Sequence, residues 1–188
     1  MKNYTADIKD YMKRHQAAIE LVDADEINAL MNVLIDARDK GRTVFIMGNG
    51  GSAATASHYA GDFNKGASIG KERKFRFICL NDNVPTMMAY ANDCSYDDVF
   101  AGPLQNFFTT GDVVIGISGS GNSGNVVKAL EWANLNGGIT VGITGYSGGR
   151  VKEISKVNVH IPVYDMQIAE DLHVMLDHCM MQIICEKE

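Results

Sequence analysis

Short β-rich runs alternate with helix-length segments through most of this chain, and this alternation restricts the possible folds more than any other feature. Each run combines β-branched and other apolar residues, as buried strands do. The spacers are mostly long enough for crossover helices, which join parallel strands by right-handed connections. The predicted strands are residues 43–47, 75–80, 112–118, 139–144 and 157–163. We therefore predict a doubly wound α/β sandwich with a five-stranded parallel sheet, in the order 2-1-3-4-5.

Helical patterns flank this region on both sides. Residues 1–40 predict two helices, the second with Asp25 as its N-cap and Gly41 as its stop. Residues 166–186 predict a long helix with a methionine-rich apolar stripe, which is typical of a core or a subunit interface. We expect a single domain over residues 1–188, in which 1–40 form a helical arm outside the sandwich formed by 41–188. The helical surfaces favour a homo-oligomer.

A loop rich in serine and glycine occupies residues 115–125, between the third predicted strand and a helical pattern. Its glycines allow sharp turns and close approach of a ligand, and the N–H groups of the following helix favour an anion. A flexible Gly/Ser linker is the alternative. Ser118, Gly119, Ser120 and Ser123 are its candidate substrate-binding residues, and the three serines are candidate phosphate ligands together with Ser52.

A second glycine loop follows the first predicted strand and consists of Asn49, Gly50, Gly51 and Ser52. It lacks the spacing and the lysine of a nucleotide P-loop, and it also lacks the G-x-G-x-x-G spacing of dinucleotide sites. In the order 2-1-3-4-5, strands 1 and 3 are neighbours at the switch point of the sheet, so both loops face one crevice. Two small, neutral, donor-rich loops indicate a phosphorylated small molecule.

Composition excludes several other classes of protein. The net charge is −6 and no Lys/Arg-rich run occurs, which argues against general nucleic-acid binding. The N-terminus has no apolar core typical of a signal peptide, and no apolar run is long enough to span a bilayer. The four cysteines form no C-x-x-C pair, as expected of buried, reduced residues. We expect a cytoplasmic protein without a membrane partner.

Three motifs in order resemble the sugar isomerase (SIS) domain: N-G-G-S-A-A-x-x-x-H at 49–58, Asn92-Asp93, and I-S-x-S-G-N-S at 117–123. With His173 and His178 on the final helix, the chain most closely resembles the phosphoheptose (sedoheptulose-7-phosphate) isomerases. The resemblance implies a flavodoxin-like SIS sandwich and a tetramer with sites at subunit interfaces. It also implies that Asn92 and Asp93 contact the sugar.

Four side chains are the candidates for chemistry and for a divalent metal, with Zn²⁺ the expected ion. His58 and Asp62 are four residues apart on one predicted helix and share a face, while Glu170 and His178 lie on the last helix. In the resembled family a glutamate stands at the position of Asp62 and a glutamine at that of Glu170. Glu170 and His178 are about 12 Å apart along a regular helix, which makes joint ligation of one ion awkward. The four could equally be an acid/base set without a metal.

The resemblance implies an aldose–ketose isomerase of phosphorylated sugars, acting on sedoheptulose 7-phosphate by way of an enediolate in the synthesis of heptose precursors for the bacterial surface. Asp62, His178 and Glu170 are its expected catalytic residues, and Glu170 is also expected to contact the substrate. The alternative is a non-catalytic SIS module that binds a sugar phosphate or a protein partner such as the replication initiator. The departures at Asp62 and Glu170 support this alternative, whereas the retained histidines favour the enzyme.

Overall fold

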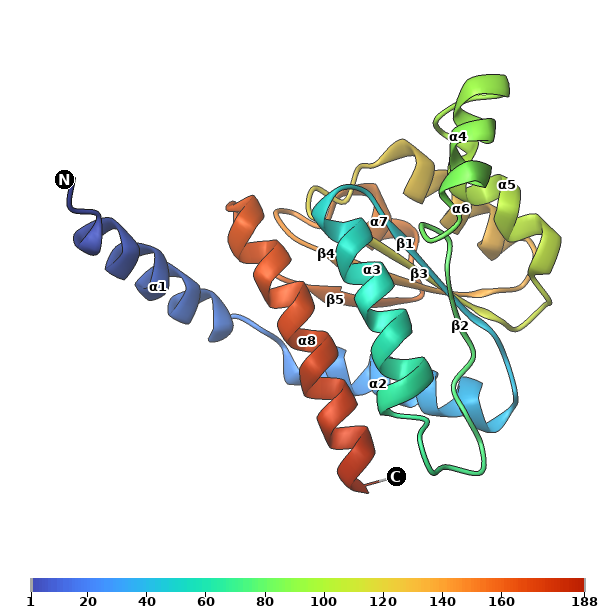
Figure 1. Cartoon of the computed structure of the whole chain (residues 1–188), viewed down its shortest axis with the longest axis horizontal. Coiled ribbons are helices and arrows are strands. Elements are labelled where there is room, and N and C mark those ends of the chain that lie inside the picture. The colour runs from blue at the N-terminus through green and yellow to red at the C-terminus, as the bar shows by residue number, and fades with distance from the viewer. Residues whose placement is uncertain (1, 188) are drawn as a thin grey trace.

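A parallel five-stranded sheet lies at the centre of the computed structural model, which describes residues 2–187 (Figure 1). The strand order is β2-β1-β3-β4-β5, so the predicted order 2-1-3-4-5 is confirmed. The first strand, β1, pairs with β3 along its whole length. The outer strands are shorter than predicted: β2 lacks residues at both ends of its predicted range, and β5 ends at His160. The strands are β1 (Val44–Gly48), β2 (Phe77–Cys79), β3 (Val113–Ser118), β4 (Ile139–Thr144) and β5 (Val157–His160).

Helices cover both faces of the sheet, and alternate residues of β3 show which face each group covers. Ile115 packs in a cluster with residues of α2 (Ala24–Asp39), α3 (Gly51–Gly61) and α8 (Met166–Lys187). Val114 points the opposite way, as successive strand residues do, into a cluster with residues of α5 (Asp98–Phe107), α6 (Gly124–Leu135) and α7 (Gly149–Ile154). The doubly wound sandwich is therefore present, with one hydrophobic core on each side of the sheet.

The N-terminal helices differ from the prediction in one respect. Helix α1 (Thr5–Ile19) projects from the body as an arm (Figure 1). Helix α2 does not lie outside the sandwich, because Leu30 and Leu34 are fully buried in the core. Its N-cap is Asp23 rather than Asp25, since the Asp23 carboxylate accepts a hydrogen bond from the Asp25 backbone N–H. The predicted stop is confirmed, because Gly41 follows the helix with a φ of 66°.

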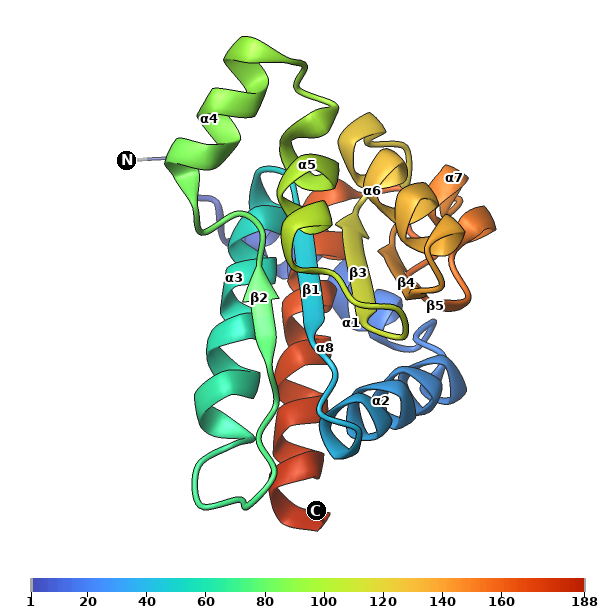
Figure 2. The same cartoon turned by 90° about the vertical axis from the view of Figure 1, so that its right-hand side faces the viewer.

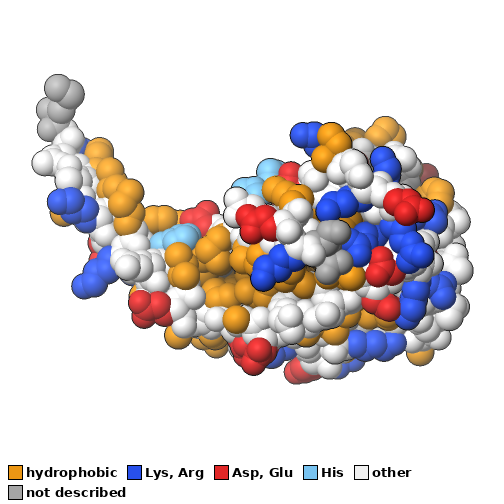
Figure 3. Space-filling view, turned by 90° about the horizontal axis from the view of Figure 1, so that it is seen from below, with side chains coloured by type: hydrophobic (Ala, Val, Ile, Leu, Met, Phe, Trp, Pro, Cys, Tyr) orange, Lys and Arg blue, Asp and Glu red, His pale blue; other side chains and the backbone are white. Residues whose placement is uncertain are grey.

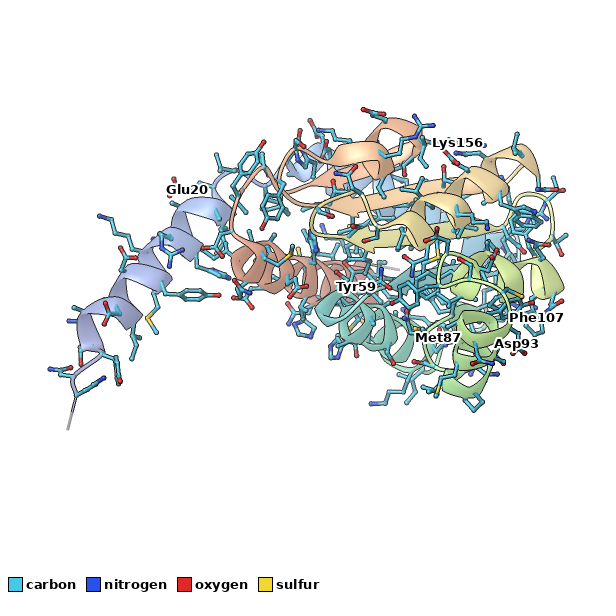
Figure 4. All side chains as sticks on the ribbon, turned by 90° about the horizontal axis from the view of Figure 1, so that it is seen from above. Glu20, Tyr59, Met87, Asp93, Phe107 and Lys156 are labelled. Atoms are coloured by element: carbon cyan, nitrogen blue, oxygen red, sulfur yellow. The ribbon has the colours of Figure 1, made fainter. Side chains whose placement is uncertain are left out.

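Helices α3 and α8 run side by side along one face of the sheet (Figures 1 and 2). Tyr59 lies between them, and its buried hydroxyl donates to the backbone carbonyl of His173 at 3.1 Å (Figure 4). Immediately after α3 the chain forms a π-helical turn, η1 (Asp62–Gly66), a type of turn frequent at functional sites. No helix within residues 2–187 is long and apolar enough to cross a membrane.

Candidate functional site

The two glycine loops meet where β1 and β3 end, as predicted. Gly48 is paired with Ile117 at these ends, so the loops leave the sheet side by side. A reciprocal amide pair joins them: Asn49 Nδ2 donates to Asn125 Oδ1 at 2.8 Å, and Asn125 Nδ2 donates to Asn49 Oδ1 at 2.9 Å. Tyr96 also donates to Asn49 Oδ1, at 3.0 Å. The sequence argument did not single out Asn125 or Tyr96, because an amide pair depends on which loop lies opposite.

A cavity of about 170 Å³ lies between the loops. Ser118 is buried and its hydroxyl bonds that of Ser123 at 3.0 Å, while the Ser120 hydroxyl accepts from the Asn122 N–H at 3.2 Å. Serine oxygens are therefore held at fixed positions around the cavity. One of the Ser118 and Ser123 hydroxyls donates to the other, so the remaining one and the Ser120 hydroxyl can donate to a ligand. The lining residues are Asn49, Ser52, Ile117, Ser118, Gly119, Ser120, Ser123, Met166 and Glu170.

The cavity offers neutral donors to an anion. None of its described lining residues is a lysine or an arginine. Ser123 is the N-cap of α6, so the first N–H groups of that helix begin at the cavity wall. Helix N-terminal donors and hydroxyls suit a phosphate without a balancing side-chain cation.

Glycines at two positions shape the first loop. Gly50 has φ 56° and ψ −122°, a conformation that residues with a side chain rarely adopt. At Gly51 a Cβ atom would lie only 2.4 Å from Glu170 Oε2. The absence of a side chain at Gly51 therefore lets the Glu170 carboxylate rest directly against the start of α3.

A second cavity, of about 300 Å³, lies on the other side of this contact. It shares Glu170 with the serine-lined cavity, and its wall also includes Gly51, Thr55 and His58 of α3 and Asp171 of α8. Glu170 thus stands at the junction between the two cavities. A ligand that occupies both must pass its carboxylate.

A cluster of two histidines and two aspartates lies beyond the second cavity, where α3 faces α8. His58 Nε2 is 2.8 Å from His178 Nε2 and 3.7 Å from Asp62 Oδ2, so the predicted shared face of His58 and Asp62 is confirmed. Asp62 Oδ2 is 4.0 Å from His178 Nε2. The fourth member is Asp177, whose Oδ2 is 3.7 Å from His58 Nε2. The ligand atoms of all four residues lie within 4.8 Å of one another.

Asp177 was missed by the sequence argument and is the most unusual member of the cluster. Its side chain is 0% exposed, and neither carboxylate oxygen has a hydrogen-bond partner among the described residues. Burial, and then the negative charge of Asp62, raise the pKa of Asp177 to about 7. A signal was present in the sequence: His173, Asp177, Met180 and Ile184 follow one another at helical spacing and all are buried, so a carboxylate interrupts an apolar stripe.

The cluster fits a divalent metal ion. Tetrahedral Zn²⁺ ligands lie about 3.3 Å from one another, and two imidazoles with two carboxylates are ordinary zinc ligands. The buried carboxylate of Asp177, which has no hydrogen-bond partner among residues 2–187, is the kind of group that a cation stabilises. Glu170, which the prediction added to this set, lies instead against Gly51, because it is two helical turns from His178.

The structure also shows where the two predicted sugar contacts, Asn92 and Asp93, and the buried His173 lie. Asn92 and Asp93 end α4 (Val84–Asp93), are exposed, and bond each other at 2.7 Å. Asp93 lies well away from Tyr59 of α3 (Figure 4), and neither residue is among those that line the two cavities of a single chain. His173 is fully buried, in agreement with a structural role, and this burial lowers its pKa to about 4.

Comparison with known proteins gives the same family at the level of sequence and of fold. The SIS domain family model matches residues 3–145. The phosphoheptose isomerase of Aliarcobacter butzleri is 31% identical over 96% of this chain and 96% of its own. The probable phosphoheptose isomerase of Thermoplasma volcanium is 34% identical over 95% of this chain and 90% of its own.

A solved structure agrees with the sequence relatives. The phosphoheptose isomerase of Neisseria gonorrhoeae superposes with a TM-score of 0.90, over 98% of this chain and 100% of that one, at 24% identity. At this identity the likeness concerns the fold, and the family rests on the sequence matches that extend over almost the whole chain. The chain therefore belongs to the SIS-domain family and, within it, to the phosphoheptose isomerases.

Proposed function

We propose that this chain is an aldose–ketose isomerase that interconverts sedoheptulose 7-phosphate and D-glycero-D-manno-heptose 7-phosphate in heptose precursor synthesis. One observation carries the proposal: a phosphate-sized cavity lined by serines and a histidine–carboxylate cluster are linked by the second cavity, which meets the first at Glu170 and reaches His58 of the cluster. A non-catalytic sugar-phosphate module needs only the first of these. The relatives that match over nearly the whole chain are named as enzymes, which also supports catalysis.

The substrate spans the junction. Its phosphate binds Ser118, Ser120 and Ser123 and the start of α6, where hydroxyl and backbone donors meet. The sugar chain then passes Glu170, so its C1 and C2 atoms reach the side on which His58 lies. Sedoheptulose 7-phosphate carries its phosphate at one end of a seven-carbon chain and reacts at the other end. This order matches the serine-lined cavity at one end of the site and His58 at the other. Asn49, Gly50, Gly51 and Ser52 form the opposite wall, and Asn92 and Asp93 are proposed as sugar contacts contributed across a subunit interface.

The reaction moves one proton between C1 and C2. From the ketose, a carboxylate base (Asp62 or Glu170) takes a proton from C1, and the enediolate that forms receives a proton at C2. His178, whose side chain is 52% exposed, exchanges protons with solvent and moves the proton between the sugar hydroxyl and carbonyl oxygens. Positioned groups of this kind each contribute about 10²–10⁴-fold to the rate.

We propose that His58, Asp62 and His178 hold a divalent ion, with Zn²⁺ as the expected metal. When bound, such an ion supplies a Lewis acid that stabilises negative charge on the sugar oxygens.

We infer a cytoplasmic location, which is supported by four free cysteines. Among them, Cys79 is buried, and desolvation raises its pKa to about 12.

A homo-oligomer, expected to be a tetramer with sites at subunit interfaces, is supported by unpartnered apolar surface. On the projecting helix α1, Ile8 and Met12 are more than half exposed. A groove of about 430 Å³ between α2 and α8 is lined by Met31, Ile183 and Ile184 among others. Figure 3 shows apolar side chains along the arm and across the surface beside its base. Light scattering of the purified chain measures the oligomeric state, and a monomer at micromolar concentration would contradict this proposal.

The activity is tested by incubating the zinc-supplied protein with sedoheptulose 7-phosphate and following the aldose phosphate. Fructose 6-phosphate tests whether the reaction requires a seven-carbon chain. Sedoheptulose without the phosphate tests whether the serine-lined cavity must hold a phosphate. We expect turnover of the seven-carbon phosphate and at least about 10²-fold lower kcat/KM without the phosphate. No turnover of any seven- or six-carbon ketose phosphate would refute the isomerase. Thermal stabilisation by the sugar phosphate without turnover would indicate the binding module instead.

A further inference from the structure

We propose that Asp177 is the fourth protein ligand of the metal, and that Glu170 is left facing the sugar as a proton-transfer carboxylate. The inference rests on the proposed function for the presence of the metal, and it changes the ligand set that the sequence predicted. In this set His58, Asp62, Asp177 and His178 surround one ion, and both carboxylates come from aspartates.

The four side chains approach one point from different directions. His58 and His178 reach it from the solvent side, with side chains 47% and 52% exposed. Asp62 comes from the π-helical turn after α3 and is 28% exposed, whereas Asp177 is 0% exposed and comes from the core side. The 2.8 Å separation of the two imidazole Nε2 atoms shows that both rings already point at the same place. An ion at this place would take Asp177 as its fourth protein ligand.

The surroundings of Asp177 give it no other partner. Neither of its carboxylate oxygens accepts a hydrogen bond from any residue between 2 and 187, although the side chain is completely enclosed. Burying a carboxylate without a partner is strongly unfavourable, so natural cores pair such groups with donors or with metals. Another cluster member lies close to it, since His58 Nε2 is 3.7 Å from Asp177 Oδ2. A cation among these four residues accounts for a group that the fold otherwise leaves unsatisfied.

Glu170 lies in a different place. Its carboxylate rests against Gly51 and lines both cavities, so it is next to the path of the substrate. Eight residues of α8 separate it from His178, or about 12 Å along the helix axis. With Asp62 and Asp177 both bound, two carboxylates balance the charge of a divalent ion, and a third is free to take a proton from the sugar.

Metal binding by three variants tests the assignment without using isomerase activity. Asp177→Asn removes the proposed ligand, Glu170→Gln removes the carboxylate first expected to bind, and Asp171→Asn is the matched control, an exposed carboxylate on the same helix. Each full-length protein is purified without a chelator, and zinc is measured by elemental analysis and by competition with a chromophoric chelator. The visible spectrum of the Co²⁺-substituted proteins reports the ligand geometry.

We expect Asp177→Asn to weaken zinc binding by more than about 100-fold, the upper end of what loss of an outer-shell partner costs, and to change the Co²⁺ spectrum. Glu170→Gln and Asp171→Asn should keep the zinc content, affinity and spectrum of the parent. Zinc binding that survives in Asp177→Asn but is lost in Glu170→Gln would overturn the inference. A parent protein that binds no zinc or Co²⁺ would also overturn it. An active enzyme would then leave the isomerase proposal standing, since these readouts are independent of turnover.

Thermal unfolding separates a ligand from a merely structural residue. The metal-free Asp177→Asn variant should melt at or above the Tm of the metal-free parent, because the substitution removes a buried charge that has no partner. Added zinc should then raise its Tm by much less than it raises that of the parent. If the metal-free variant is instead less stable and its zinc-dependent rise in Tm is unchanged, Asp177 is structural and the inference is wrong.

Discussion

The serine-lined cavity and the histidine–aspartate cluster are linked by the second cavity, yet they are built in opposite ways. The cavity is formed by two loops at neighbouring strand ends, and its amides and hydroxyls already bond one another, as in the Asn49–Asn125 pair. The cluster joins α3 to α8, residues 58–62 to residues 177–178, and leaves the buried Asp177 carboxylate without a hydrogen bond among the described residues. Apart from Glu170 at its edge, the first region is lined by uncharged side chains that bond one another, whereas the second buries a carboxylate that has no hydrogen-bond partner among residues 2–187.

This difference separates binding from chemistry. Preorganised neutral donors hold an anion without having to be rearranged, so the loops suit the part of the substrate that does not react. Groups that exchange protons or bind a metal must be able to change charge, and the cluster places them at the other end of the sugar. Changes in the cavity should therefore affect affinity, and changes in the cluster should affect turnover.

The largest expected effect belongs to His178. His178→Ala removes a cluster nitrogen and a proton-transfer group, so kcat should fall by at least about 10²–10⁴-fold. Binding of sedoheptulose 7-phosphate, measured by calorimetry, should change far less, because the phosphate cavity is untouched. His15→Ala, on α1, is the control histidine. Equal losses of affinity and of turnover in His178→Ala would contradict the division between the two regions.

The opposite pattern is expected for the serine loop. Ser120→Ala removes a hydroxyl from the cavity and should weaken substrate binding by roughly 1.5–3 kcal/mol, the range for a hydrogen bond to a charged group. Ser147→Ala, an exposed serine that is not among the residues lining this cavity, should leave the affinity unchanged. An unaltered KM and Kd in Ser120→Ala would show that the phosphate binds elsewhere.

The buried histidine of α8, His173, can be examined through pH and stability. Burial holds the pKa of His173 at about 4 in the folded chain, against 6.5 when unfolded, so the unfolded chain takes up the proton first as pH falls. The stability contributed by the neutral His173 is complete above pH 6.5 and is lost between about pH 6.5 and 4. Relative to the parent, His173→Leu should therefore gain about 2 kcal/mol of unfolding free energy between pH 7.5 and pH 5. Urea unfolding at the two pH values measures this gain, and parallel curves for parent and variant would contradict the buried, neutral histidine.

The smallest effect is expected at the contact that aligns α3 with α8. Tyr59→Phe removes the hydrogen bond to the His173 carbonyl and should lower the unfolding free energy by about 1 kcal/mol. Because this contact supports the cluster and not the loops, kcat should fall while the affinity for the sugar phosphate stays the same. A variant that binds the sugar phosphate more weakly but keeps a normal kcat would contradict the assignment of this contact to the cluster.

The same contrast explains which parts of the site the sequence could predict. Ser118 ends a buried strand and Ser120 and Ser123 follow it, so their convergence with Asn49 followed from strand order alone. Asp177 is more than 110 positions from Asp62, and its role depends on how deeply one face of α8 is buried. The sequence pattern predicted the helix, but it did not predict how deeply each turn of the helix is buried.

Helix α2 and Glu170 show the same limit. The apolar face of α2 was recognised, yet whether it covered the sheet or a partner subunit depended on tertiary packing, and the structure places Leu30 and Leu34 in the core. Glu170 was grouped with the metal residues by family position. Its contact with Gly51 could be seen only when α3 and α8 lay side by side.

The most direct test of the division between binding and chemistry is isomerisation in D₂O. Zinc-supplied protein is incubated with sedoheptulose 7-phosphate in D₂O, and the aldose product is analysed by NMR for deuterium at C2. Because the side chains of His58 and His178 are about half exposed, protons held by the site should exchange with solvent. We predict an aldoheptose 7-phosphate that carries deuterium at C2, and loss of this product in His178→Ala. An aldose that retains only protium at C2, transferred from C1, would contradict proton transfer through this cluster.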